Sequence, residues 1–382
     1  MIRARLRTTR DARALTATLA IAMATFGATA ATADALPASF WGVVPQSALS
    51  AEQFQRLARG GVQSTRVTLD WAALQPRRGA PIDWSGPDAI IERAALAGIE
   101  VLPAFADAPS WAVRSARVPG GGWSTAPAHL PITGAAATGW KSLLTLAIQR
   151  YGPNGEFWAT HPILPVRPIS TWQIWNEPNF KFFVAKPNPT EYGKLVVLSY
   201  SAIRSADPGA RIVLGGLFAQ PKGARTPSGK HTSLNWFASD FLNKMYKTTP
   251  GVSASFSGVA LHPYTSTWQH LTPEIEEVHR VLEANHDPGK AMWITELGWS
   301  SEPPGTGDAF AKGAAGQAAE LKGAFTLLRK NQRRWHIQQV DWFSVDDQPG
   351  GCNFCGGSGL FGPGFTPKPA WRAYARFAHG TA

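Results

Sequence analysis

The sequence predicts a single α/β domain, a closed (β/α)8 TIM barrel with long loops at its C-terminal face. Short apolar runs alternate with amphipathic stretches eight times along residues 34–382. Strict β-α alternation of this kind implies a parallel sheet, and eight units of this size suit a closed barrel. Neither a linker nor a low-complexity segment interrupts the pattern, so we expect one domain over residues 34–382.

The expected strands are short and rich in β-branched residues. In chain order they are Phe40–Val44, Ser64–Leu69, Glu100–Phe105, Ser170–Trp175, Arg211–Leu217, Gly258–His262, Met292–Glu296 and Gln339–Ser344. The helical patterns between and after them are Ala51–Arg59, Pro87–Ala97, Gly139–Arg150, Thr190–Ala206, Asn235–Lys247, Pro273–Asn285, Asp308–Lys330 and Pro369–Ala378. Ser50 with Gln53 is typical of a helix N-terminus and Gly98 of a helix end. Gly215-Gly216, at the end of the fifth strand, predicts a tight turn.

Three irregular stretches stand out, at Ala106–Thr138, Tyr151–Pro168 and Pro349–Pro367. The first and the last follow the third and the eighth strand. In a barrel they would therefore lie at the carboxyl-terminal face, where barrel enzymes keep their active sites.

Residues 1–33 have the pattern of a secretory signal peptide. Five arginines and one aspartate precede an apolar, alanine-rich run from Ala14 to about Ala30, and small-residue cleavage signals follow at 28–30 and 31–33. A membrane anchor is the alternative, but the run is short and weakly apolar for a spanning helix. We therefore expect residues 34–382 to be secreted and to contain no membrane span.

The basic charge does not indicate a nucleic-acid partner. Removing residues 1–33, with five arginines and one aspartate, lowers the formal net charge from +11 to +7. The remaining excess is spread along the chain and not gathered into basic tracts. General solubility accounts for it, and binding to anionic cell-wall polymers is the alternative.

The only cysteines are Cys352 and Cys355. In an exported protein a local disulfide is the leading interpretation. A zinc site would need further ligands, and a redox role would need a thioredoxin-like context. The sequence has no G-x-S-x-G elbow, no H-E-x-x-H, no EF-hand and no phosphate-binding glycine loop, so nothing calls for a metal or a cofactor.

Two acidic residues lie at or just after the ends of predicted strands, in surroundings typical of catalytic carboxylates. Glu177 lies in Trp172–Pro178 and Glu296 in Trp293–Trp299, and each follows a short apolar run among aromatic residues. A carboxylate there is costly to desolvate unless it is hydrogen-bonded or used. Strands four and seven of a barrel would direct both into one mouth. Hydrolysis of a glycosidic bond needs such a pair, one carboxyl to protonate the leaving oxygen and one to attack or stabilise the anomeric carbon.

These motifs resemble glycoside hydrolase clan A, in particular the cellulase-like families 5 and 39. The resemblance rests on Trp175-Asn-Glu-Pro178 after the fourth strand and Thr295-Glu-Leu-Gly-Trp299 after the seventh. Arg66 on the second strand, His262-Pro-Tyr264 on the sixth and Asp341-Trp-Phe343 on the eighth complete it. It covers nearly all of residues 34–382. The Pro119–Gly122 segment and the Cys352–Cys355 hairpin have no counterpart in that pattern.

The resemblance implies a role for each motif residue. Glu177 would be the general acid and later the general base, and Glu296 the nucleophile. Arg66 and the hydroxyl of Tyr264 would keep Glu296 ionised by charge and hydrogen bonding. Asn176 would donate to the sugar 2-hydroxyl.

Two further residues have competing explanations. His262 would hydrogen-bond to the sugar or to Glu177, but a hydrogen-bonded core histidine explains it equally well. Trp342 would be the platform beneath the sugar ring, and ordinary core packing is the alternative. Arg66 and the two carboxylates could also form a structural ion pair.

We therefore expect a secreted retaining glycoside hydrolase that acts on a β-linked poly- or oligosaccharide and uses no cofactor. One alternative is a transglycosylase on the same site. The other is a catalytically silent polysaccharide-binding barrel, although both carboxylates are in place. The sequence leaves the sugar, the linkage, endo or exo action and the oligomeric state open.

Overall fold

The computed structural model describes residues 36–118, 125–219, 236–305, 308–350, 352 and 354–382. The chain divides into two compact units, Met1–Ala35 and Leu36–Ala382. The first unit, which contains the expected signal peptide, lies outside the described residues, and so does the Pro119–Gly122 segment. Everything below concerns the second unit.

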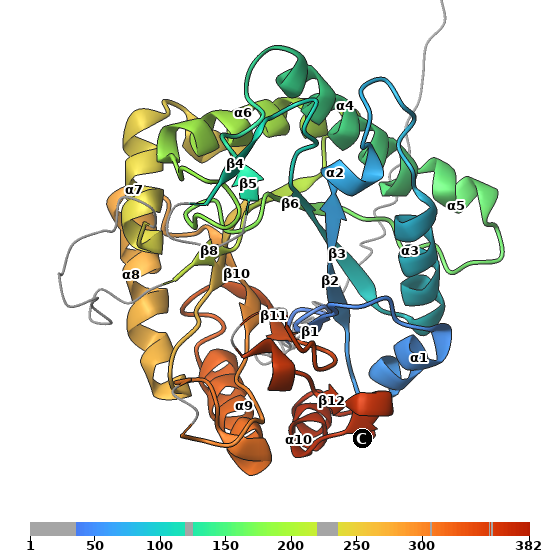
Figure 1. Cartoon of the computed structure of the whole chain (residues 1–382), viewed down its shortest axis with the longest axis vertical. Coiled ribbons are helices and arrows are strands. Elements are labelled where there is room, and N and C mark those ends of the chain that lie inside the picture. The colour runs from blue at the N-terminus through green and yellow to red at the C-terminus, as the bar shows by residue number, and fades with distance from the viewer. Residues whose placement is uncertain (1–35, 119–124, 220–235, 306–307, 351, 353) are drawn as a thin grey trace, which may run out of the picture. The chain divides into compact units, whose positions relative to one another are not determined.

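The second unit is a closed barrel of eight parallel strands, with helices between them (Figure 1). In barrel order the strands are β1 (Trp41–Val44), β2 (Ser64–Asp70), β3 (Glu100–Ala106), β6 (Thr171–Ile174), β7 (Arg211–Leu214), β9 (Gly258–His262), β10 (Ala291–Leu297) and β11 (Ile337–Phe343). Each pairs with the next, and β11 pairs back onto β1. The predicted (β/α)8 fold is confirmed.

The helices surround the strands in Figure 1. They are α1 (Ala51–Arg59), α2 (Trp71–Leu74), α3 (Ser85–Ala97), α4 (Gly134–Tyr151), α5 (Glu156–Thr160), α6 (Pro189–Ala206), α7 (Ala238–Thr248), α8 (Leu271–Ala284), α9 (Gly313–Lys330) and α10 (Pro369–Phe377). Short 3₁₀ helices lie at η1 (Val252–Ser255), η2 (Trp268–His270), η3 (Cys355–Gly357) and η4 (Pro363–Phe365). None of the described helices is both long and apolar enough to cross a membrane.

Local sequence explains most helix boundaries. Ser50 and Gln53 form the predicted capping box of α1, and Gly98 ends α3 with φ 75°. The predicted start of α4 was too late, because three alanines at 135–137 favour helix from the first turn. The predicted start of α9 was too early. The chain before it is held by tertiary hydrogen bonds, such as that from the amide of Gly313 to the carbonyl of Glu302 (2.7 Å).

Strand alternation decides what fills the barrel. One set of side chains packs outward against the helices, and the other points inward. An apolar inner layer is formed by Leu102, Val213, Ala260 and Trp293. The inward positions nearer the carboxyl ends of the strands are polar, and they include Arg66 and Gln173, which are hydrogen-bonded to each other.

The loops hold small additional elements. The stretch after β3 contains the hairpin β4 (Ser115–Arg117) and β5 (Thr125–Pro127), and the stretch after β11 contains β12 (Phe361–Gly362) and β13 (Thr366–Pro367). The expected fifth strand is interrupted and continues as β8 (Leu217–Phe218), which also pairs with β9.

The interruption at Gly215-Gly216 is a close approach and not the tight turn that the sequence suggested. Neither glycine has a positive φ. A Cβ on Gly216 would lie 1.9 Å from Nε2 of His262, and a Cβ on Gly215 would lie 2.8 Å from the carbonyl oxygen of Ile174. Both positions therefore need a residue without a side chain.

Candidate active site

Glu177 and Glu296 meet at the carboxyl-terminal mouth of the barrel. Glu177 lies three residues after the end of β6, and Glu296 lies within β10. Their side chains are buried, with 5% and 9% of the residue surface exposed. One oxygen of each carboxyl group and a ring nitrogen of His262 all lie within 4.8 Å of one another. The structure thus brings together the two carboxylates that the sequence singled out.

The backbone around Glu177 is held in an uncommon conformation. Trp175 and Glu177 have φ angles of 70° and 41°, in the left-handed region that side chains disfavour. The hydroxyl of Tyr192 donates to the carbonyl of Ile174 (2.8 Å) and accepts from the amide of Gly215 (2.6 Å). Such strain persists only where the surroundings enforce it, and it is common at functional sites.

An irregularity in β10 aims Glu296 into the barrel. Thr295 points inward, since it contacts His262, and strict alternation would turn the next side chain outward. The register between β10 and β11 shifts between Ile294 and Leu297, and Glu296 also faces inward. Re-aiming a side chain beside a site is a common role of such irregularities.

Arg66 is the electrostatic centre of the site. Its side chain is buried and donates three hydrogen bonds of 2.6 Å, to Glu296, to Gln173 and to Asn176. Because a guanidinium only donates, the Asn176 atom that faces it must be the oxygen. The amide nitrogen of Asn176 is therefore the donor that this residue has left to offer.

The two carboxyl groups have different neighbours. Burial raises the pKa of Glu296, while Arg66 and the hydroxyl of Tyr264, 2.8 Å from Oε2, lower it. Burial and the charge of Glu296 raise the pKa of Glu177 well above its usual value, and Arg66 opposes this from farther away. The proton that the pair keeps at neutral pH therefore belongs on Glu177, and Glu296 carries the charge.

His262 joins Glu177 to two residues that sequence reasoning missed. Its Nδ1 lies 2.7 Å from Glu177, and its Nε2 lies 3.0 Å from the hydroxyl of Thr295. Thr295 also accepts from the amide of Gln173 (3.4 Å). Burial and the charge of Arg66 lower the pKa of His262, so the ring is neutral. With Thr295 donating to Nε2, the ring proton sits on Nδ1 and points at Glu177.

The sequence pattern indicates only part of this relay, by which we mean the hydrogen bonds from Gln173 through Thr295 to His262. A polar Gln173 in the middle of an apolar strand indicates an inward, hydrogen-bonded position. The partnership of Thr295 with His262 joins residues on different strands, and no local pattern encodes it.

A second pair of carboxylates at the mouth was also missed. Asp70 ends β2, and Asp107 follows β3 with φ 55°. Burial and the neighbouring charge of Asp70 raise the pKa of Asp107 to about 6. Because β2 and β3 are paired through Asp70, these groups lie on the Arg66 side of the mouth.

A family model described as glycosyl hydrolase catalytic core matches residues 168–355. That range contains Glu177, His262 and Glu296, the residues that the geometry brings together. This part of the chain is similar to the glycosyl hydrolase catalytic core family. No curated protein matches the sequence.

Solved glycoside hydrolases share the fold. A family 39 glycoside hydrolase from Bacteroides cellulosilyticus WH2 is 20% identical, with a TM-score of 0.64 over 90% of this chain, and the chain spans 64% of that enzyme. TsXylA, an intracellular xylanase from Thermoanaerobacterium saccharolyticum JW/SL-YS485, is 15% identical, with a TM-score of 0.58 over 89% of this chain and 95% of the xylanase. A monomeric β-xylosidase from Caulobacter crescentus CB15 is 18% identical, with a TM-score of 0.57 over 90% and 69% of the two chains. The resemblance to clan A glycoside hydrolases is confirmed.

The structure does not place Trp342 as a platform for a sugar ring. Its side chain is 0% exposed, its indole donates to the carbonyl of Ser358 (3.1 Å), and its ring packs near Phe325 of α9. Asp341 points into the barrel, so the next residue on the strand points out. The prediction for Trp342 was wrong. Phe343 faces the mouth instead, with its ring centroid 6.2 Å from that of Tyr264.

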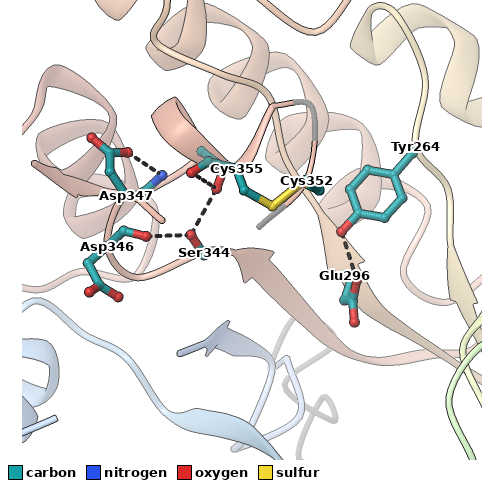
Figure 2. Close-up of a disulfide and its surroundings, with 9 residues drawn as sticks. Tyr264, Glu296, Ser344, Asp346, Asp347, Cys352 and Cys355 are labelled. Carbon is teal, nitrogen blue, oxygen red and sulfur yellow. Dashed lines mark hydrogen bonds between the residues drawn. A yellow bond between two sulfur atoms is a disulfide. The ribbon is translucent and has the colours of Figure 1, made fainter. Parts of the chain in front are cut away.

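A disulfide joins Cys352 to Cys355, with a Cα–Cα distance of 5.0 Å. Figure 2 shows it together with the hydrogen bond from Tyr264 to Glu296. Phe354, between the two cysteines, packs with its ring centroid 5.3 Å from that of Tyr264. The hairpin therefore supports Tyr264, which donates to the carboxylate of Glu296.

Within the described part of the chain, Glu177, His262 and Glu296 also form a group that could hold a metal ion. The guanidinium of Arg66 already lies 2.6 Å from Glu296 and would repel a second positive charge. We therefore assign the three residues to acid–base and nucleophilic chemistry.

Proposed function

We propose that the protein is a retaining glycoside hydrolase that cleaves a β-linked poly- or oligosaccharide by double displacement. The separation of the carboxyl groups carries this proposal, because oxygens of Glu177 and Glu296 lie within 4.8 Å. The two groups are roughly 5–5.5 Å apart in retaining enzymes and roughly 6.5–9.5 Å apart in inverting ones. The spacing leaves no room for the water that inversion would place between a base and the sugar.

In the first step Glu296 attacks the anomeric carbon and Glu177 gives its proton to the glycosidic oxygen. The bond to the leaving sugar breaks, and an ester forms between the anomeric carbon and Glu296. Arg66 and Tyr264 hold one oxygen each of Glu296, which orients the carboxylate and keeps it ionised. The high pKa of Glu177 keeps its proton available.

In the second step Glu177, now ionised, takes a proton from water, and the water oxygen attacks the anomeric carbon. The ester breaks, Glu296 leaves as a carboxylate, and the sugar is released with its original configuration. The proton on Nδ1 of His262 faces Glu177 at 2.7 Å and stabilises the charge that it carries between the steps.

Two residues would hold the sugar during these steps. The free amide nitrogen of Asn176 is the donor for the 2-hydroxyl, a contact that strengthens in the transition state. The ring of Phe343 would lie against the apolar face of the sugar.

The names of the similar structures support a substrate class for this protein. They include β-xylosidases, xylanases and a glucosidase, which supports a neutral β-linked chain of xylose or glucose units. The signal-peptide pattern of residues 1–33 supports secretion, and a secreted enzyme would encounter such polymers outside the cell.

The test is a screen of residues 34–382 against aryl β-glycosides and plant, fungal and bacterial polysaccharides, with Glu296→Ala run alongside. We expect the parent to release sugar and the variant to lose this activity, with azide restoring it as an inverted glycosyl azide. Equal background rates for both proteins, with polysaccharide binding retained, would instead establish a silent binding barrel.

A further inference from the structure

The loop after Glu177 carries phenylalanines that the catalytic steps do not use. The ring of Phe180 stacks on that of Phe218 in β8, with centroids 4.6 Å apart and planes 12° from parallel. Phe182 meets Phe180 edge-on at 5.0 Å, and Phe218 lies 6.2 Å from Tyr264. We call Tyr264, Phe218, Phe180 and Phe182 the aromatic row. It begins at the residue that holds the nucleophile.

The aromatic row leads outward from the buried site to solvent. Tyr264, Phe218 and Phe180 are half-buried, and Phe182 at the outer end is 41% exposed. An exposed phenylalanine gives up the free energy that burial of its ring would contribute. One such residue alone is ordinary, but this one continues a row of ring contacts that starts in the active site.

The row is fixed by hydrogen bonds and does not depend on ring packing alone. Asn179, which is buried, donates to the carbonyl of Phe218 (2.8 Å) and accepts from its amide (2.9 Å). The amide of Phe180 donates to the carbonyl of Glu177 (2.9 Å), and the indole of Trp175 donates to the carbonyl of Phe183 (3.1 Å). The rings are thus held in place before a ligand arrives, which lowers the entropy cost of binding.

The position of the row identifies the side of the substrate that it meets. The general acid must lie beside the oxygen of the leaving sugar. Phe180 and Phe182, at the outer end of the row, follow Glu177 on the same loop. Arg66 lies in β2, Asp70 ends β2 and Asp107 follows β3, and the side chain of Asn176 is turned toward Arg66 by their hydrogen bond. The leaving sugar and the chain attached to it therefore extend along the row.

We propose that the aromatic row binds sugar units on the leaving-group side of the cleaved bond, so that the enzyme cuts within β-linked chains. Pyranose rings with equatorial substituents present C–H faces that pack against aromatic rings. Phe218 and Phe180 contact the sugars nearest the cleaved bond, and Phe182 contacts a unit farther toward the reducing end. This inference rests on the proposed function, because it assigns the leaving-group side from the role of Glu177.

The experiment compares Phe182→Ala and Phe182→Trp with the parent. Leu96→Ala is the matched control, because Leu96 is 49% exposed and lies on α3, away from the mouth. The probes are xylohexaose, cellohexaose, laminarihexaose and mannohexaose, cleaved in isotopically labelled water to locate the broken bond. β-Xylosyl fluoride and β-glucosyl fluoride serve as substrates with no ring on the leaving-group side.

We expect Phe182→Ala to lower kcat/KM on the best hexasaccharide by roughly 10-fold, as for the loss of one stacking contact of about 1–1.5 kcal/mol. The broken bond should move toward the reducing end, since fewer units are bound beyond it. Hydrolysis of the fluorides should not change. Phe182→Trp should restore the parent pattern, and Leu96→Ala should keep it throughout.

Other outcomes overturn the inference in distinguishable ways. Unchanged rate and bond position in Phe182→Ala would show that the row is structural and would leave the proposed function standing. Cleavage of a fluoride but of no hexasaccharide would also overturn the inference alone. A parent that cleaves none of the probes would overturn the proposed function and this inference with it.

Discussion

Glu177 and Glu296 are the same residue type, lie within 4.8 Å of each other and have different neighbours. Glu296 accepts from Arg66 and Tyr264, and Glu177 faces the neutral ring of His262. Both pKa values rise through burial, but only Glu296 has a direct contact with a charged donor, the guanidinium of Arg66, that opposes the rise. Their surroundings therefore suit Glu177 to the proposed role of acid and Glu296 to that of nucleophile.

The raised pKa of Glu177 predicts the alkaline side of the pH–rate profile. Glu177 must be protonated to act as an acid, so kcat/KM falls as pH rises through its pKa. Glu177→Gln cannot titrate, and we expect this variant to lose the alkaline limb. With an oligosaccharide its rate should fall by roughly 10²–10⁴-fold. A dinitrophenyl glycoside, whose leaving group needs no proton, should be attacked nearly as fast as before. An alkaline limb that persists in Glu177→Gln would assign it to another group.

Removal of the Thr295 hydroxyl should also change the alkaline limb of the pH–rate profile. Thr295→Val keeps the shape of the side chain but removes the donor to Nε2 of His262. The other tautomer then turns a lone pair toward Glu177, which favours the protonated acid and raises its pKa. We expect the alkaline limb to move to higher pH and kcat/KM to fall by on the order of 10-fold.

Thr295→Ser, which keeps the hydroxyl, is the matched control and should retain the parent profile. A thermal midpoint close to that of the parent would exclude unfolding as the cause. If valine and serine variants gave the same profile, the hydroxyl would have no part in setting the tautomer.

Trp342 and Phe343 show which residue-scale details the sequence could have provided. Inward Asp341 and strand alternation together place Trp342 outside the barrel and Phe343 inside. That information was present in the sequence. The relay from Gln173 through Thr295 to His262 was not, because it depends on contacts across three strands.

At the scale of elements, the break between β7 and β8 makes room for His262. A Cβ on Gly216 would lie 1.9 Å from Nε2 of His262, an atom that cannot move without losing its contact with Thr295. We expect Gly216→Ala to displace the ring, lowering kcat/KM by on the order of 100-fold and the free energy of unfolding by about 1–3 kcal/mol.

Gly86→Ala is the control for that substitution. Gly86 lies in α3, and a Cβ there would meet nothing within 4 Å. Chemical denaturation and steady-state kinetics of both variants provide the comparison. If Gly216→Ala left activity unchanged, His262 would not need its present position.

The strands were predicted more accurately than the other elements. Apart from the interrupted fifth strand, each lies within two residues of its expected bounds. Buried strands of a parallel barrel are continuous apolar runs, so their ends are clear. The hairpins β4–β5 and β12–β13 were not predicted, because two- and three-residue strands carry too little pattern.

At the scale of the whole molecule, Glu274 limits stability. It lies in α8 and is 3% exposed, and among the described residues neither carboxyl oxygen has a hydrogen-bond partner. Burial and the charge of Glu277 raise its pKa to about 9. The folded protein therefore keeps this proton while the unfolded chain, with a normal pKa, loses it. The contribution of Glu274 to the free energy of unfolding is therefore fully present below the pKa that this residue has in the unfolded chain. It is lost as pH rises toward 9.

Glu274→Met removes this titration and should stabilise the protein at neutral pH by on the order of a few kcal/mol. The gain should shrink toward acidic pH, where both states are protonated. Glu283→Gln, on the exposed face of the same helix, is the control and should show no such trend. Thermal midpoints measured across the pH range would contradict the account if the difference between Glu274→Met and the parent did not grow with pH.

The global fold could be predicted because one period, strand then helix, repeats around the whole barrel and each unit packs only on its neighbours. The meeting of Glu177 and Glu296 at one mouth followed from that fold, since the ends of all parallel strands share one face. Which rings line the mouth depends on loop conformation, which the sequence pattern does not fix. The aromatic row was therefore visible only in the structure.

The most direct test of the account is to trap the intermediate. A fluorosugar inactivator slows both steps of a retaining enzyme, but a reactive leaving group lets the first step proceed. Peptide mapping by mass spectrometry then locates the attached sugar. The account predicts one sugar per chain, attached to Glu296, and none in Glu296→Ala. A label on Glu177, or an inverted product with no label at all, would contradict it.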